Sequence, residues 1–369
     1  REKDEAVTPH GLAKSLSTLA QVQMKQGRLR DALGNAQRYV NIMRSRLDVV
    51  QQSLSTSALG ENLNSRELFG VFLEIAYSNL GQPDRDWNEL NAEMFEVAQF
   101  PHITDTAGAV TRMAARFAPQ QTELASLVRQ RQDAAEQWRA VDRMITEQLA
   151  GKTSLPRNRE LELRRELVRL NEKIESLDET LREKFPKFTE LTNPRPVPLK
   201  TVQRLLKPEE ALLLQTTGET GTFVFLVRQH DINLAQTDMS KKDLDRSVAS
   251  LRKGLVAHRP PFDTTAAHYL YRNLISPLKS NLDGIRNIIA VVDGTMQNLP
   301  LSVLLVSPAA SPESSSNFQQ LDFLALHYAI SVVPSVSAFE ALRSVVKPSE
   351  SKEPFVGFGD PDWNRPSAG

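Results

Sequence analysis

The hydrophobic pattern of the chain changes period at a proline-rich stretch near the middle of its 369 residues. Before this stretch, apolar residues recur at spacings of three and four from Gly11 to about Thr192, as they do in amphipathic helices. After it, they fall into short runs of strand length. The stretch Asn193–Pro198 has proline at alternate positions, which disfavours a helix and predicts a stiff, extended linker over residues 193–200. We therefore expect an all-α half followed by an α/β half.

The first region of the helical half, residues 1–120, opens with the pattern of two amphipathic helices joined by a short turn. Residues 11–44 resemble one tetratricopeptide-type repeat, a helix–turn–helix unit of about 34 residues. The positions assigned to its two facing surfaces and its turn are Leu16, Leu19, Ala20, Ala32, Ala36, Tyr39 and Gln26-Gly27-Arg28. A second, more degenerate pair is expected over Ser65–Gln99, turning at residues 80–83. Any helical hairpin would share much of this pattern, so the repeat type is an interpretation.

A heptad pattern makes residues 121–192 the most regular part of the helical half. Apolar residues step by four and three over residues 163–181, which is the spacing of a coiled-coil seam, and a similar stripe covers residues 124–149. Residues 151–156 interrupt the helix between the two stripes. We expect a long antiparallel hairpin whose stripes bury each other, with Trp138 in the core. An intermolecular coiled coil is the alternative, because a seam does not specify which helix it faces.

Beyond the linker, residues 201–369 begin with three strand-like runs joined by short turns. They predict an antiparallel meander over Ala211–Thr217, Thr222–Arg228 and Asp231–Gln236. Amphipathic helices are expected next, over Lys241–Gly254 and Ala266–Leu282.

From Ile285 onward, hydrophobic strands alternate with helices. The expected elements are a strand at Ile285–Val292, a helix around Leu321–His327, a strand at Ala329–Val333, a helix opening with the capping-box pattern Ser337–Glu340, and a strand at Phe355–Phe358. Strands that are apolar throughout and separated by helices predict a parallel sheet covered on both faces.

Composition narrows the classes of partner and site. The 45 basic and 45 acidic residues balance, so charge gives no reason to expect nucleic acid or an anionic membrane as a partner. No apolar stretch approaches the roughly 18 residues that span a bilayer. Since there is no cysteine, a disulfide framework, a thiolate metal site and a thiol nucleophile are excluded within these residues, and a reducing, cytoplasmic compartment is favoured. We expect no metal site and no cofactor.

Several segments of the second half resemble a known family. Val291–Leu304 is similar to the "P-D-G-x-L-x-x-L-P-F-x-x-L" segment of CHAT domains, the caspase-like domains found attached to tetratricopeptide repeats in bacteria. Tyr328–Ser335 resembles the family's "Y-x-I-S-Y-x-P-S" strand and cap, Val356–Pro361 its "G-x-G-D-P" strand, and Leu270–Leu278 the segment just upstream. The likeness covers roughly residues 200–369. Val292 and Leu301 depart from the pattern but remain apolar.

This resemblance implies a cysteine peptidase architecture with a histidine and a cysteine at the ends of two later parallel strands. A thiolate would attack a peptide carbonyl, an imidazole would move the proton, and backbone N–H groups would stabilise the oxyanion. No residue of this chain matches either catalytic position. We therefore expect the dyad to lie beyond Gly369 and these 369 residues to be inert as a peptidase.

Structural roles explain the individual candidate residues better than catalytic or ligand-binding roles do. The histidines, none paired at helical metal-site spacing, are His10, His102, His230, His258, His268 and His327. His327 has apolar neighbours and is expected to pack as a structural residue. Gly357-Phe358-Gly359 lacks the third glycine and the helix of a dinucleotide fingerprint. A turn explains Asp293-Gly294 better than a metal or base site does, and Ser335 is expected to cap a helix rather than act as a nucleophile.

Two functions follow from the resemblance. In the first, the complete protein is a Cys/His-dependent peptidase that acts on protein substrates, while its helical repeats recognise a protein partner. In the second, it is a non-catalytic interaction scaffold, because helical repeats present binding surfaces and a caspase-like domain without its dyad can still bind protein.

Overall fold

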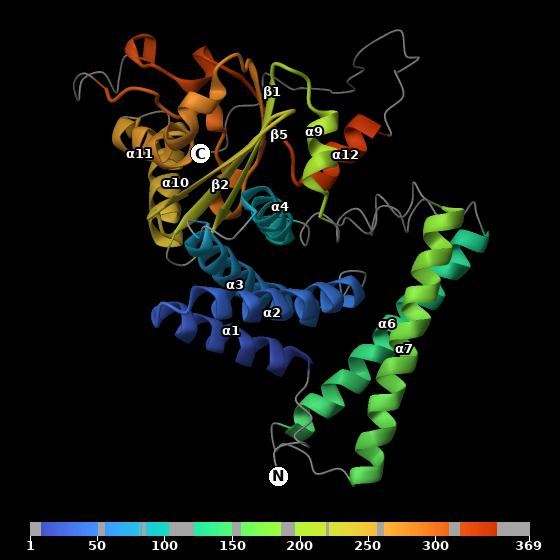
Figure 1. Cartoon of the computed structure of the whole chain (residues 1–369). Helices are drawn as coiled ribbons and strands as arrows, with labels where there is room; N and C mark the ends of the chain where they lie inside the picture. The colour runs from blue at the N-terminus through green and yellow to red at the C-terminus, as the bar shows by residue number, and fades with distance from the viewer. Residues whose placement is uncertain are drawn as a thin grey trace, which may run out of the picture.

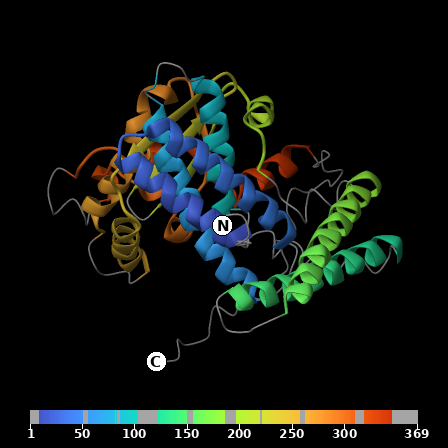
Figure 2. The same cartoon turned by 60° about the horizontal axis from the view of Figure 1, so that its bottom comes forward.

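A computed structural model of the chain describes residues 9–50, 56–80, 82, 86–102, 122–149, 156–185, 196–218, 221–256, 262–309 and 318–344. Figure 1 shows helices from the first half lying against a sheet formed by the second half, with a long helical hairpin to one side. In the view turned by 60°, the hairpin still lies apart from the sheet (Figure 2). The predicted order of a helical half followed by an α/β half is confirmed.

The first two helices, α1 (Pro9–Lys25) and α2 (Leu29–Val50), form the predicted hairpin. Gly27 has a φ of +75°, which suits a residue without a Cβ, and its backbone N–H donates to the Met24 carbonyl at 3.0 Å. Ala20 and Ala32 are fully buried, so two small side chains let the helices approach closely. The prediction for Leu19 is wrong, because its side chain is 45% exposed on the outer face of α1. The likeness to a tetratricopeptide repeat stays a prediction.

The second predicted pair consists of α3 (Thr56–Asn79) and α4 (Trp87–Ala98). Helix α3 begins earlier than the expected Ser65 and contacts both α2 and α4. Asp86 caps α4, since its carboxylate accepts the backbone N–H of Asn88 at 2.8 Å. Part of the predicted turn, residues 81 and 83, lies outside the described residues.

Helices α6 (Thr122–Leu149) and α7 (Arg157–Lys184) form the predicted long hairpin. Their apolar stripes bury each other within the chain, and Trp138 is 6% exposed in this cluster, which confirms its place in the core. The interruption predicted at residues 151–156 lies outside the described residues except for Pro156, which precedes α7.

The described residues of the second half form a five-stranded sheet in the order β3-β2-β1-β4-β5. Its strands are β1 (Glu210–Thr217), β2 (Thr222–Val227), β3 (Ile232–Thr237), β4 (Asn287–Val291) and β5 (Ala329–Val332). The first three strands form the predicted antiparallel meander, while β1–β4 and β4–β5 are parallel pairs. The sheet is therefore mixed, and its change of direction falls on β1.

One face of the sheet is covered by α10 (Lys241–Val256) and α11 (Thr264–Leu274), which pack on Ala211, Leu213 and their neighbours. The predicted helix over residues 266–282 instead ends at Leu274 and continues as the 3₁₀ helix η2 (Ser276–Leu282). Pro277 accounts for the break, because it lacks the backbone N–H that the α-helix needs.

Short 3₁₀ turns connect β4 to β5. They are η3 (Gly294–Asn298), η4 (Leu301–Val303), η6 (Phe318–Gln320) and η7 (Leu324–Leu326). The predicted helix over residues 321–327 is therefore only one 3₁₀ turn, because tertiary packing of Leu321 and Leu324, and a bridge between Leu305 and Phe323, hold this segment.

The other face of the sheet is covered by helices from both halves of the chain: α3, α4, α9 (Leu199–Leu205) and α12 (Val336–Ser344). Leu212 and Phe225 share one hydrophobic cluster with side chains of α2, α3 and α4. The extended linker predicted over residues 193–200 is wrong at its end, since α9 begins at Leu199. Proline disfavours a helix interior but tolerates its start, and Pro198 is the residue that precedes α9.

Strand β5 lies at the edge of the described sheet and is less buried than predicted. Val332 is 53% exposed, because β5 pairs with β4 on one side only within the described residues. The strand predicted at residues 355–358 lies outside those residues. After β5, the Ser335 hydroxyl accepts the Ala338 backbone N–H at 3.1 Å, so Ser335 caps α12 as predicted. The capping box predicted at Ser337 is wrong, since Ser337 already lies inside α12.

Candidate functional site

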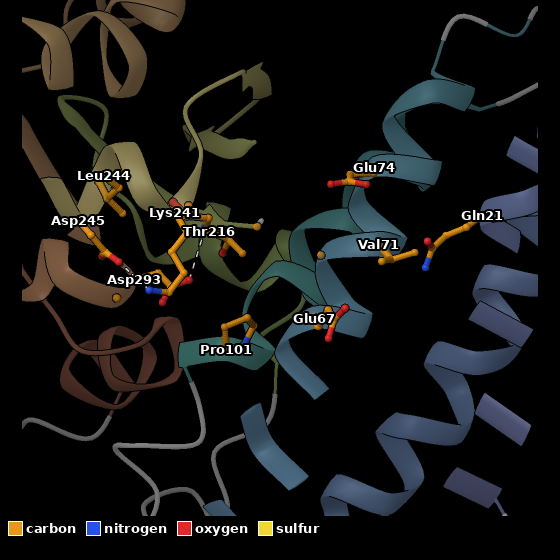
Figure 3. Close-up of a pocket in the computed structure, with 14 residues that line it drawn as sticks. Gln21, Glu67, Val71, Glu74, Pro101, Thr216, Lys241, Leu244, Asp245 and Asp293 are labelled. Atoms are coloured by element: carbon orange, nitrogen blue, oxygen red, sulfur yellow. Dashed lines mark hydrogen bonds and ion pairs between the residues drawn. The ribbon is translucent and has the colours of Figure 1, made fainter. Parts of the chain in front are cut away.

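A cavity of about 380 Å³ opens between helix α3 and the carboxyl ends of the parallel strands β1 and β4 (Figure 3). Its other walls come from α1, from the start of α10 and from the residues just after α4. The volume is within the range of small-ligand sites. In open α/β sheets, ligands bind beyond the carboxyl ends of the strands, so the location also favours a binding site.

Asp293 follows β4 and is held at the cavity by the neighbouring strand β1. Its backbone N–H donates to the side-chain oxygen of Gln215 at 2.8 Å, and its carboxylate accepts the Thr217 backbone N–H at 3.4 Å. Asp293 is only 7% exposed. Gly294, with a φ of +59°, then turns the chain into η3, which confirms the predicted turn. The turn places a buried carboxylate at the end of a strand.

A series of side-chain hydrogen bonds holds the end of β1 in place beside Asp293. The Thr222 hydroxyl donates to the Met239 carbonyl at 2.7 Å, so it accepts from the Thr217 hydroxyl at 3.0 Å. The Thr217 hydroxyl in turn accepts from the Gln215 amide. Because each hydroxyl has one proton to donate, every donor in this chain is assigned, which connects the end of β4 rigidly to the residues before α10.

Helix α10 brings one ammonium group and one carboxylate to the cavity. Lys241 Nζ lies 2.7 Å from Asp245 Oδ2, and the Thr295 hydroxyl donates to Asp245 Oδ1 at 2.8 Å. Burial raises the pKa of Asp245, but the hydrogen bonds from Lys241 and Thr295, with the charge of Lys241, outweigh it and lower the pKa overall. Asp245 therefore stays ionised and holds the Lys241 ammonium.

Helix α3 forms the opposite wall with residues spaced three and four apart on one face, among them Glu67, Gly70 and Glu74. Helix α3 lies next to the end of β1 here, since a Cβ at Gly70 would lie 3.8 Å from the Cα of Gly218, an ordinary van der Waals distance. Figure 3 shows the two glutamates on the α3 side and Asp293 on the sheet side. The lining thus has an acidic wall on each side.

Buried polar contacts dock the helical half onto the same end of β1. The Thr216 hydroxyl donates to the Ala98 carbonyl at 2.9 Å. It must therefore accept from His102 Nε2, 3.2 Å away, which assigns the proton of this histidine to Nε2. Thr216 and His102 are 3% and 2% exposed, so water does not supply these bonds.

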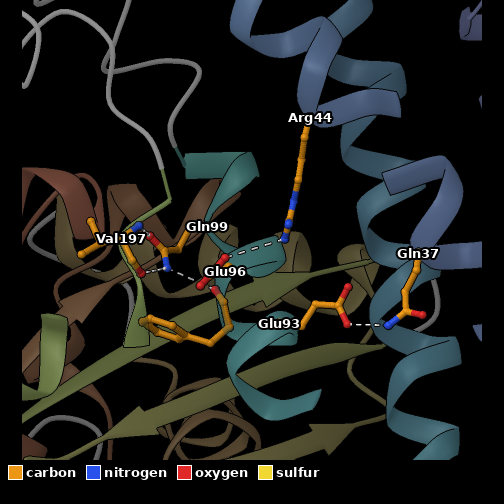
Figure 4. A network of polar contacts seen from close by, with 7 residues as sticks. Gln37, Arg44, Glu93, Glu96, Gln99 and Val197 are labelled. Atoms are coloured by element: carbon orange, nitrogen blue, oxygen red, sulfur yellow. Dashed lines mark hydrogen bonds and ion pairs between the residues drawn. The ribbon is translucent and has the colours of Figure 1, made fainter. Parts of the chain in front are cut away.

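Gln99 joins the end of α4 to the segment that enters α9 (Figure 4). Its side chain accepts the Val197 backbone N–H at 2.8 Å and donates to the Val197 carbonyl at 3.0 Å, which satisfies both polar groups of one buried residue. Nearby, Arg44 Nη2 lies 4.0 Å from Glu96 Oε2. Burial raises the pKa of Glu96, and the charge of Arg44 offsets only part of this increase.

The segment that bears β4, β5 and the cavity's Asp293 is also the part of the chain that matches a protein family. Residues 264–368 match the CHAT domain family. No curated protein and no solved structure matches the chain. The matched residues, called the CHAT segment below, begin with α11, so the meander β1–β3 and the whole helical half precede it. The predicted resemblance is confirmed for this segment.

The prediction for His327, which lies in the CHAT segment, is wrong. Its side chain is 43% exposed and its Nε2 lies 2.6 Å from Asp322 Oδ1, instead of being packed among apolar groups. Residues 324–326 form a 3₁₀ turn rather than the predicted helix, and His327 follows this turn at the surface. The Ser307 hydroxyl donates to the other oxygen of Asp322 at 2.9 Å. This contact joins two separate segments of the loop between β4 and β5.

The remaining predicted positions lie apart from the cavity or outside the described residues. His230 is exposed, and His268 Nδ1 lies 3.0 Å from the Leu305 carbonyl. His258 and residues 357–359 are not among the described residues, and neither is the side chain of His10. Across the described ranges, no group of three or more histidine or acidic residues is arranged to hold a metal ion. None of the helices described combines the length and apolar character needed to cross a bilayer.

Sequence reasoning singled out Asp293 but explained it as part of a turn, and it missed the glutamates of α3 and the Lys241–Asp245 pair. The spacing of Lys241 and Asp245, one helical turn apart, is a detectable signal for an ion pair. Glu67 and Glu74 lie more than 200 residues before Asp293, and no local pattern shows that α3 faces the ends of the strands.

Proposed function

We propose that this chain belongs to a Cys/His-dependent peptidase that acts on protein substrates. The observation that carries the proposal is the coincidence of the CHAT segment with the parallel strands β4 and β5, next to a cavity at the carboxyl end of β4. In a caspase-like domain, the catalytic groups belong at that end of the sheet, where loops from a rigid scaffold converge.

In this proposal a thiolate attacks the scissile carbonyl, an imidazole transfers the proton to the leaving amine, and backbone N–H groups stabilise the oxyanion. The 369 residues contain no cysteine, so the thiol must be supplied by residues outside them. The part of the machinery within the chain is the scaffold: β1 and β4 set the direction of the parallel strands, and the bonds between Asp293, Gln215 and Thr217 keep their ends in register.

The helical half would recognise a protein partner. Two observations support this part of the proposal. Apolar side chains on the outer face of α1 are exposed, namely Leu12, Leu19 and Val22 at 38%, 45% and 46%. The helical half also contacts the sheet directly through Thr216 and the shared hydrophobic cluster, so a partner bound to the helices has a route to the strand ends.

The test uses the complete reading frame that contains this chain. Its product is incubated with an unstructured protein such as casein, beside a variant in which the cysteine of the proposed dyad is replaced by alanine. We expect cleavage by the wild type and none by the variant. Equal cleavage by both, or cleavage by neither with and without candidate partners, would contradict the peptidase function and favour an interaction scaffold.

Asp293 provides a second arm of the same test. Asp293→Asn removes the charge at the end of β4, and Asp283→Asn is the matched control because Asp283 is exposed. If the strand ends position the catalytic groups, Asp293→Asn lowers kcat/KM by about tenfold or more while Asp283→Asn leaves it unchanged. Equal effects of the two substitutions would argue against a positioning role.

A further inference from the structure

Helix α7 carries a second set of residues at heptad spacing, on the face that points away from α6. We call this set the α7 stripe. It steps by four and three, and all of its members are exposed: Leu161, Arg165, Val168, Glu172, Glu175 and Glu179. The residues of α7 that pack on α6, such as Leu163 and Leu170, lie about half a turn around the helix from it. Leu161 and Val168 are 49% and 59% exposed, so the stripe presents apolar side chains to solvent.

The charges of the α7 stripe are divided between its two halves. Arg165 lies in the first half, and the three glutamates make up the second. The other exposed charges described on α7 follow the same division: before residue 170 arginines outnumber glutamates, and after it glutamates outnumber lysines. The outer face of α7 is therefore basic towards one end and acidic towards the other.

The charged side chains of the stripe also lack the partners that their neighbours have. Arg169, which lies beside the stripe, pairs with Glu166 at 2.7 Å. Among the residues that the structure describes, the side chains of Arg165, Glu172 and Glu179 have no ion-pair partner. These charges are free to pair with another molecule.

An antiparallel pair of α7 stripes would bring unlike charges together. Arg165 precedes Val168 by three positions and Glu172 follows it by four. If two antiparallel helices cross at Val168, Arg165 of each copy therefore faces Glu172 of the other, and the two Val168 side chains meet at the crossing. A parallel pair would instead align each charge with its like, which is unfavourable.

We propose that the α7 stripe is a homodimer interface, on which a second copy of this chain packs its own α7 in the antiparallel direction. Both copies use the same residues, and the two-fold axis passes through Val168. The hairpin lies to one side of the sheet in both views (Figures 1 and 2), so this contact joins the copies through their hairpins and not through their sheets. The inference does not depend on the peptidase proposal.

Sedimentation equilibrium of the purified 369-residue chain, at about 1–200 µM, measures this association. The stripe has only two apolar residues, and exposed ion pairs contribute little each, so we expect a weak dimer that is populated in the upper part of this range. Raising the NaCl concentration from about 0.05 M to about 0.5 M screens exposed charges and should weaken the dimer several-fold.

Charge reversals identify the paired residues. Arg165→Glu alone and Glu172→Arg alone each place like charges opposite each other and should weaken dimerisation by about tenfold or more. The two substitutions combined in one chain restore unlike pairs and should restore the dimer. An equimolar mixture of the two single variants should also dimerise, since each then faces its complement. Positions 165 and 172 are two turns apart, so a contact within one helix cannot explain the restoration.

Lys173→Glu is the matched control for Arg165→Glu. Lys173 is exposed on α7 outside the stripe, and its reversal changes the net charge by the same amount. We expect this variant to dimerise like the wild type. All of the substituted side chains are exposed, so the substitutions should leave the hairpin folded, and circular dichroism with thermal unfolding of each variant checks this.

Three results would overturn the inference. The first is a monomer at every concentration tested. The second is a dimer that Arg165→Glu and Glu172→Arg leave intact, which would place the contact elsewhere on the chain. The third is failure of either the double variant or the mixture of single variants to dimerise, which would rule out the antiparallel pairing of positions 165 and 172. None of these measurements uses peptidase activity, so the two proposals can fail separately.

Discussion

The buried ion pair in the α6–α7 hairpin gives a prediction whose size follows from the structure. Arg131 Nε lies 2.7 Å from Asp178 Oδ1, and Arg131 Nη2 lies 3.1 Å from the other carboxylate oxygen, so the pair is bidentate. The two side chains are only 2% and 9% exposed. Two opposite charges about 4 Å apart attract by about 4 kcal/mol at an effective dielectric constant of roughly 20. The desolvation of both groups offsets most of this attraction.

Replacing only one partner should therefore be costly. Asp178→Asn removes the carboxylate that accepts from two nitrogens of the buried Arg131 guanidinium, and we expect the hairpin to lose about 3–5 kcal/mol of stability. Replacing both, as in Arg131→Met with Asp178→Leu, removes both desolvation costs and should change stability by less than about 1 kcal/mol or increase it. A surface pair is the control. Glu166→Gln removes the partner of Arg169, which is 74% exposed, and should cost less than about 0.5 kcal/mol.

Hydrogen exchange read by mass spectrometry on peptides from α6 and α7 measures these changes locally. The expected order of protection is wild type and double variant together, Glu166→Gln close to them, and Asp178→Asn far below. Two outcomes would refute the reasoning: a loss of less than about 1 kcal/mol in Asp178→Asn, or a double variant that is as unstable as the single one. The first would show that Arg131 is solvated, and the second that the pair stabilises the hairpin outright.

Three further predictions concern the contacts around the sheet. Gln99→Ala leaves the buried N–H and carbonyl of Val197 without partners and should lower stability in urea unfolding by about 2–4 kcal/mol. The hydrogen bond from His327 lowers the pKa of Asp322, so the pair stabilises the fold above the unfolded pKa of about 3.9 and loses this effect as the pH falls. The difference in melting temperature between wild type and Asp322→Asn should therefore shrink from pH 6 to pH 3. Ser335→Ala removes the cap of α12 and should cost about 1 kcal/mol by thermal unfolding, whereas Ser335→Thr should restore most of it.

The elements with a strong hydrophobic period could be predicted from the sequence, because burial on one face determines them. Strand β1 was predicted from an uninterrupted apolar run instead, because both of its faces are buried: Leu212 and Leu214 pack under α3 and α4, while Ala211 and Leu213 pack under α10 and α11. The hydrophobic period also predicted the α6–α7 seam, whereas the cap at Ser335 was predicted from the need for a hydroxyl at the start of a helix. It failed for residues 321–327, where tertiary contacts override a short apolar pattern, and for Leu19, whose face of α1 is not covered within the described residues.

Contacts between distant segments could not be predicted. Gln99 and Val197 are separated by 98 residues, and His102 and Thr216 by 114, so no local spacing reports either bond. The candidate site depends on the same kind of contact. In the sequence, Asp293 stands out as the residue that follows a strand. The glutamates opposite it belong to α3, and their position can be predicted only if the packing of the helices on the sheet is known.

The shared hydrophobic cluster has a practical consequence for anyone who works with the second half alone. A recombinant fragment that starts after the proline-rich linker would keep the strands β1 to β5 but lose helices of the first half that cover Leu212, Phe223 and Phe225. Each Å² of apolar surface so exposed to water costs about 25 cal/mol, and an uncovered sheet face of this kind promotes aggregation. An insoluble or inactive fragment would therefore say nothing about the chemistry of the intact protein, and expression trials should retain the residues from α1 onward.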